Sequence, residues 1–198
     1  MKIFQKTFFI LIFMMAPGLK GQAQTQWMMG KLQLKDGSTH SGWLAFEPTQ
    51  SPDKATISFK TEADTHPAQM YSASQITALQ YYDEQLKIRR FYGQYQGGLY
   101  ELLANNHPDL HLLMTSNLSI NAQLKKHTYR QFYFWYKGQI IPVKDFYGQW
   151  QEMAQAAGLD AEALAQKIDL DAHQPENFPV WVYALNQERS KREAVSVR

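Results

Sequence analysis

Two histidines four residues apart, His107 and His111, have the spacing at which imidazoles on successive turns of a helix could bind one metal ion. Pro108 and Asp109 lie between them and favour a turn over a continuous helix. No third ligand is evident in the sequence, and the chain has no cysteine. The pattern therefore predicts a solvated loop, with no metal and no cofactor.

The acidic and hydroxyl side chains form no catalytic pattern that the sequence alone can assemble. Asp83 and Glu84 fall in an expected hairpin tip, and several other acids fall at expected helix ends, where they favour the helix dipole. No serine stands in a Gly-x-Ser-x-Gly motif. A hydrolase whose acids or histidines converge only in the fold stays open, but the residues favour a protein without catalytic function.

Basic and aromatic side chains alternate in one segment that could bind a ligand. Arg89 and Arg90 are followed closely by Tyr92 and Tyr95. Such interleaving could stack on and neutralise a nucleic acid, although an ordinary half-buried strand with a basic outer face is the simpler explanation. If the segment binds a ligand, an anionic glycan or a lipid headgroup is favoured, and we expect no nucleic-acid partner.

The five tryptophans offer a second candidate, an aromatic platform for a saccharide. They are Trp27, Trp43, Trp135, Trp150 and Trp181, and four of them fall in strand or helix positions that a hydrophobic core would also use. Trp43 completes the set of candidate binding residues.

The start of the chain reads as a secretory signal peptide. Lys2 and Lys6 precede an apolar run at 8–15, and small residues at 21–23 provide a cleavage site after Ala23. The apolar run is about half the roughly 20 residues that a membrane span needs. We therefore expect export to the periplasm, the outer membrane or the outside of the cell, with no transmembrane span in the mature chain.

The composition of the expected mature chain limits its possible partners and the source of its stability. Residues 1–24 hold three Lys and no acid, so the 20 basic and 18 acidic residues of the whole chain become 17 and 18, a net charge of −1. A near-neutral domain has no global field to attract nucleic acid or an anionic membrane. The chain has no cysteine and therefore no disulfide bonds, so the packing of its side chains must stabilise the fold. Aromatic residues, 14% of the chain, supply much of the apolar surface for this packing.

Residues 27–143 predict an antiparallel, strongly twisted sheet or an incomplete barrel. Alternation of apolar and polar residues indicates strands around 31–35, 42–46 and 56–60, and a hairpin is expected on either side of Asp83. The segment 129–136 is aromatic on both alternating faces, so both should be covered, one of them by helices. Pro142 places its strand at a sheet edge. The structure of 96–128 stays open, although the pattern over 111–115 favours a strand.

Two or three helices are expected over 145–187. Asp145 is a candidate N-cap, followed by apolar residues at helical spacing, and a second short helix should run over 160–168. A third begins near Asn177, and residues 188–198, which lack an apolar stripe, are expected to form a disordered tail. The class is α+β, with a signal peptide at 1–23 and one domain at 24–187.

The strand segments GKLQLKDGSTHSGWLAF, SPDKATISFK, MYSASQITAL and KIRRFY together carry a resemblance. This part, about 30–92, resembles an uncharacterised family of exported proteins from Bacteroidetes-type bacteria, and the segment around Val182 resembles that family's helical tail more loosely. The resemblance implies an exported, strand-rich domain. It implies no activity and no site residue.

Taken together, these observations favour an exported, non-catalytic module that binds a protein or glycan of the cell envelope through an exposed strand edge or an aromatic patch. A hydrolase of envelope or extracellular polymers and a structural component of an envelope assembly are the alternatives. The oligomeric state is open.

Overall fold

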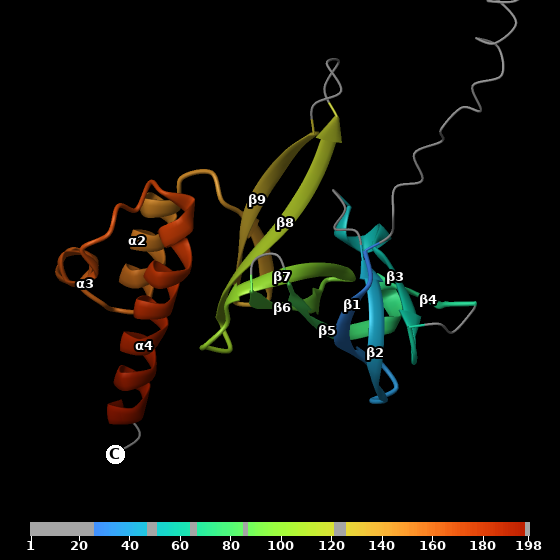
Figure 1. The fold of residues 1–198 in the computed structure, drawn as a ribbon. Helices are drawn as coiled ribbons and strands as arrows, with labels where there is room; N and C mark the ends of the chain where they lie inside the picture. The colour runs from blue at the N-terminus through green and yellow to red at the C-terminus, as the bar shows by residue number, and fades with distance from the viewer. Residues whose placement is uncertain (1–25, 47–50, 64–66, 85–86, 121–125, 197–198) are drawn as a thin grey trace, which may run out of the picture.

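Residues 26–46, 51–63, 67–84, 87–120 and 126–196 are described in a computed structural model of the chain. Within them the chain first forms one antiparallel sheet of ten strands and then three α-helices (Figure 1). This confirms the predicted α+β class. The predicted signal peptide and its cleavage site lie outside the described residues.

The sheet is labelled as in Figure 1, and each strand pairs antiparallel with its neighbours. In chain order the strands are β1 (Met28–Leu34), β2 (Thr39–Phe46), β3 (Thr56–Lys60), β4 (Gln69–Ser72), β5 (Ile76–Asp83), β6 (Ile88–Tyr95), β7 (Gly98–Ala104), β8 (Leu110–Ile120), β9 (Lys126–Tyr136) and β10 (Gln139–Pro142). Their spatial order is β10-β9-β8-β7-β6-β5-β1-β2-β3-β4. As predicted, Pro142 lies on an edge strand. The described part of 96–128 forms β7, β8 and the start of β9.

One face of the sheet is buried across six neighbouring strands. The register places one residue of each strand directly opposite the next, in the row Leu32, Leu79, Tyr92, Glu101, Met114 and Phe132. The first five are at most 6% exposed, and the last packs against the helices. We call this the inner face. The opposite, outer face carries the alternating residues, such as Gln80, Phe91 and Tyr133.

The inner face carries two hydrophobic clusters. In the N-terminal half, Leu44, Ile57 and Phe59 of β2 and β3 join the cluster of Leu32 and Leu79, so the sheet curls over its own inner face. Of the two predicted forms, a twisted sheet or an incomplete barrel, the strand order shows an open antiparallel sheet. In the C-terminal half, helices take over the same role and cover the inner face of β8 and β9.

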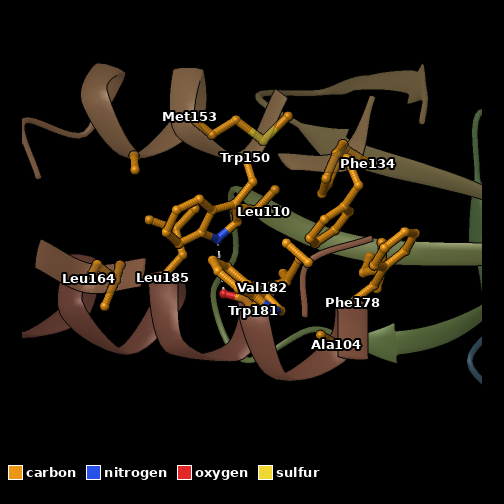
Figure 2. Packing of buried hydrophobic residues seen from close by; sticks show 14 of the residues in the cluster. Ala104, Leu110, Phe134, Trp150, Met153, Leu164, Phe178, Trp181, Val182 and Leu185 are labelled. Atoms are coloured by element: carbon orange, nitrogen blue, oxygen red, sulfur yellow. Dashed lines mark hydrogen bonds between the residues drawn. The ribbon is translucent and has the colours of Figure 1, made fainter. Parts of the chain in front are cut away.

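The helices begin where their caps predict. They are α2 (Phe146–Ala156), α3 (Ala161–Ile168) and α4 (Phe178–Ser196). The backbone N–H of Gly148 donates to the Asp145 carboxylate at 3.2 Å, and that of Ala163 donates to Asp160 at 3.0 Å. Figure 2 shows Trp150 of α2 pointing toward α4, where its indole donates to the backbone oxygen of Trp181 at 3.0 Å. No helix in the described ranges is long and apolar enough to span a membrane.

The C-terminus differs from the sequence prediction of a tail at 188–198, because α4 continues to Ser196. Polar contacts hold this extension. Arg189 is only 8% exposed and donates to Asp109, and Arg192 donates to the backbone carbonyls of Ala157 and Gly158, which directly follow α2. This last part of α4 shows no apolar stripe, because its partners are charged groups and backbone carbonyls.

Candidate binding surface

The ten described strands sort their charges between the two faces. They contain only two acidic residues, Asp83 and Glu101, and both lie on the inner face. The outer face of these described strands carries the exposed Lys31 and Arg89, together with Lys60, which is buried against Trp27, and no acid. The outer face of the strands is therefore basic, although the chain without residues 1–24 is nearly neutral.

Alternation along β6 separates the two arginines that the sequence groups together. Arg90 lies on the inner face, where its Nε donates to Asp83 at 3.0 Å and its Nη1 donates to Glu101 at 2.6 Å. Tyr92 is also on the inner face, and its hydroxyl donates to Glu101 at 3.3 Å. These candidates join a buried network and are not available to a ligand on the outer face. Arg89 points to the outer face and is exposed.

The pKa values of the inner network describe a stable charge arrangement. Burial alone lowers the pKa of Arg90, but Glu101 and Asp83 outweigh it and raise that pKa above its ordinary value. Burial, together with the charge of Glu101, also raises the pKa of Tyr92. The arginine therefore stays charged and the phenol neutral. The network lies between the two hydrophobic clusters, since Tyr92 belongs to one and Phe132, two strands beyond Glu101, packs against the other.

A groove with a volume of about 320 Å³ runs over the outer face of β1, β2, β5 and β6. Met29 and Tyr82, which are 56% and 43% exposed, give it apolar surface. Lys31 and Arg89 supply positive charge, and none of the described residues that line it is acidic. The groove can therefore hold a ligand that has both apolar surface and negative charge.

A second group of aromatic rings covers the outer face of β6 to β9. The ring of Tyr95 lies 5.1 Å from that of Trp135, 5.6 Å from that of His111 and 6.4 Å from that of Tyr100. Tyr133 adds an edge contact with Tyr100 at 5.5 Å. The helices cover the inner face of β9, whereas its outer face stays partly exposed and carries Tyr133 and Trp135 in this group of rings.

Tyr95 and His111 are joined by a hydrogen bond of 2.6 Å between the phenol oxygen and Nδ1. Burial raises the pKa of Tyr95 to about 12. Burial also lowers the pKa of His111, and this outweighs the backbone hydrogen bond of His107, which raises it. At neutral pH we therefore expect the neutral phenol to donate to the neutral imidazole.

The predicted solvated loop at His107 and His111 is wrong in that His107 lies in a loop but is buried, whereas His111 lies in a strand, as the sequence of 111–115 also favours. His107 is 2% exposed, its Nε2 lies 3.2 Å from Glu193, and its Nδ1 accepts from the backbone N–H of Asp109. His111 belongs to β8. The described part of the chain has no group of three or more His, Asp or Glu residues that could hold a metal ion.

The five tryptophans divide between core and surface. Trp150 and Trp181 are buried in the helical cluster (Figure 2). Trp43 and Trp135 are partly exposed on the outer face, and Trp27, whose ring lies 4.4 Å from Nζ of Lys60, is at its margin. The two candidates Trp43 and Tyr95 thus share the outer face with Arg89.

Sequence reasoning missed the groove residues Met29, Lys31 and Tyr82. They come from segments that meet only because β1 pairs with β5. Their outward position in alternating strands was the only local signal. Comparison with known proteins adds nothing to these observations, since no family model, no curated protein and no solved structure matches the chain.

Proposed function

We propose that this protein is an exported, non-catalytic binding module whose outer sheet face binds an acidic polysaccharide of the cell envelope. The observation that carries the proposal is the charge sorting of the ten described strands: their outer face combines aromatic rings with the exposed Lys31 and Arg89 and has no acid. The basic, apolar and small residues at the start of the chain support export to the periplasm, the outer membrane or the outside of the cell.

The chemistry of an acidic sugar matches this face. Aromatic rings offer flat apolar surfaces on which the C–H face of a sugar ring can stack, and a guanidinium can bind a carboxylate through two parallel hydrogen bonds. One exposed ion pair contributes only about 0–1 kcal/mol. Useful affinity therefore needs several contacts along the same ligand.

The length of the face suits a polymer. Arg89 and Tyr95 lie six residues apart on β6, which corresponds to about 20 Å. Both point to the outer face, Arg89 beside the groove and Tyr95 in the aromatic group, with the exposed Phe91 between them. One extended chain of sugars can contact both regions.

The position of the acids supports binding over hydrolysis. Glycoside hydrolysis needs two carboxyl groups on either side of the scissile bond. Asp83 and Glu101, the two acids of the described strands, are both held by Arg90 and lie on the face opposite the groove. The side chain of Ser72 is used in a capping box with Gln75.

The test is isothermal titration calorimetry of residues 24–198 with polygalacturonic acid and with uncharged pullulan. We expect binding to the acidic polymer only. Arg89→Ala should weaken it about three- to fivefold and make it less sensitive to salt. The matched control is Arg130→Ala, which removes another exposed strand arginine that pairs opposite Ser116, in register with the inner face. Equal binding of both polymers, or equal effects of the two substitutions, would overturn the proposal.

A further inference from the structure

A cavity of about 240 Å³ lies away from the outer face, where the β9–β10 turn meets the end of α2 and the last part of α4 (α2 and α4 in Figure 1). We infer that it is a second binding site, which takes a small oxyanion, a carboxylate or phosphate group, through Arg189. This site is independent of the polysaccharide surface, so the two can fail separately.

Arg189 carries the inference because it is buried but incompletely bonded. Its side chain is 8% exposed, and its Nη2 donates to Asp109 over 3.4 Å, a long contact. Its Nη1 is buried and has no hydrogen-bond partner among the described residues. A guanidinium remains protonated at any physiological pH, so an unpaired buried donor destabilises the fold unless an acceptor reaches it.

The guanidinium lines the cavity together with two other cations. Lys137 lies in the β9–β10 turn with its Nζ 5.1 Å from the ring of Tyr136. Arg192 also lines it and donates to the backbone oxygens of Ala157 and Gly158, which neutralises the negative end of α2.

The charge balance leaves room for one anion. Arg189, Lys137 and Arg192 contribute three positive charges, and Asp109 and Glu193 contribute two negative ones, a difference of +1. Both acids already have partners. Asp109 accepts from Arg189, and Glu193 lies 3.2 Å from Nε2 of His107. A single bound carboxylate would therefore balance the local charge, and a phosphate group, with a charge of about −1.5 to −2 at neutral pH, would more than balance it.

The size of the cavity limits the ligand. A volume of 240 Å³ corresponds to about eight water molecules in the liquid, and drug-sized ligands generally occupy about 300–1,000 Å³. The aromatic wall at Tyr136 gives room for a short apolar part. A small organic acid and a phosphate ester share the required oxyanion, and the experiment separates them.

The experiment measures thermal unfolding and calorimetric binding of residues 24–198 with sodium succinate or sodium phosphate, with sodium chloride at matched ionic strength as the reference. We expect a saturable rise in melting temperature with one of the two anions. Succinate binding would identify a carboxylate site, and phosphate binding would identify a phosphate site. A shift no larger than that of chloride with both anions would overturn the inference.

Substitutions test whether the rise in melting temperature comes from binding in this cavity. Arg189→Lys keeps the positive charge but removes the planar guanidinium, which can donate two parallel hydrogen bonds to an oxyanion. We expect a loss of affinity of about tenfold. If this variant does not fold, Lys137→Ala decides, because Lys137 is exposed and its removal should weaken binding a few-fold without changing the fold. Lys191→Ala, on the same helix and 67% exposed, is the control and should bind normally. Binding by the Lys137 variant equal to that of the control would contradict the site.

Discussion

Removal of residues 188–198 tests whether the end of α4 is part of the fold. The truncated chain loses Arg189 with its contact to Asp109, Glu193 with its contact to the buried His107, and Arg192 with its bonds to the end of α2. These contacts connect α4 to the β7–β8 loop and to α2. Their loss should destabilise the C-terminal half of the molecule.

The size of the effect follows from these three groups of contacts. Each hydrogen-bonded contact contributes about 0.5–1.5 kcal/mol net, and the contact of Arg189 belongs at the low end because Asp109 is 55% exposed. The ordering cost of this segment is largely offset by its strong helix formers, such as Glu, Arg, Lys and Ala. We therefore expect a loss of about 2–3 kcal/mol, or about 5–10 °C at 2–4 °C per kcal/mol for a chain of this size.

Circular dichroism on heating measures the effect, with residues 24–187 compared with residues 24–198. Lys191→Ala is the internal control, since its pair with Glu188 is exposed and should contribute less than about 0.5 kcal/mol. If the truncated chain melts within about 1 °C of the longer chain, the segment is a tail in solution and the contacts of Arg189 and Arg192 contribute nothing to stability.

Three further predictions concern the cores and the outer face. Trp150→Ala should destabilise the protein by about 3–5 kcal/mol in urea unfolding, because the indole is fully buried and donates to a backbone oxygen. Arg90→Ala should cost about 3–5 kcal/mol in the same assay, since it leaves Glu101 buried without its cation, and Arg90→Leu with Glu101→Leu should recover most of the loss. Burial lowers the pKa of His111, so the folded state binds fewer protons than the unfolded state. The contribution of His111 to stability should therefore be complete above about pH 6.5 and should be lost on acidification below it. His111→Gln should reduce this dependence of stability on pH.

The elements that the sequence predicted correctly are set by local rules. Asp145 and Asp160 cap their helices because a carboxylate within one turn satisfies free backbone N–H groups. Pro142 lies at the sheet edge because proline cannot donate to a second neighbour. Neither prediction needs knowledge of any distant residue.

The elements that could not be predicted depend on distant partners. Tyr100–Ala104 has bulky residues on both faces, so its alternation does not separate strand from helix until β6 and β8 pair with it. The end of α4 has polar partners in the β7–β8 loop, about 80 residues earlier, and an apolar-stripe criterion cannot detect them. In both cases long-range contacts decided between two local possibilities.

Only part of the candidate site could be predicted, because the rest of it depends on contacts between distant segments. Arg89, Tyr95 and Trp43 share a face, as alternation within each strand permits, but Arg90 and Tyr92 fall on the other face by that same alternation. The prediction treated the basic aromatic segment as one patch and ignored that successive side chains of a strand point to opposite faces. Lys31 joins Arg89 at the groove only through the pairing of β1 with β5, which no local pattern in either strand reveals.

Charge sorting across the sheet would let a nearly neutral domain bind the anionic ligand that we propose. Only two of the acids lie in the described strands, and both are paired with Arg90 on the inner face. The outer face of the strands is therefore locally positive while the net charge gives no long-range attraction. Such a surface should bind its polymer with modest salt dependence, set by the few cations in contact, such as Lys31 and Arg89, and aromatic contacts should supply the remainder of the affinity.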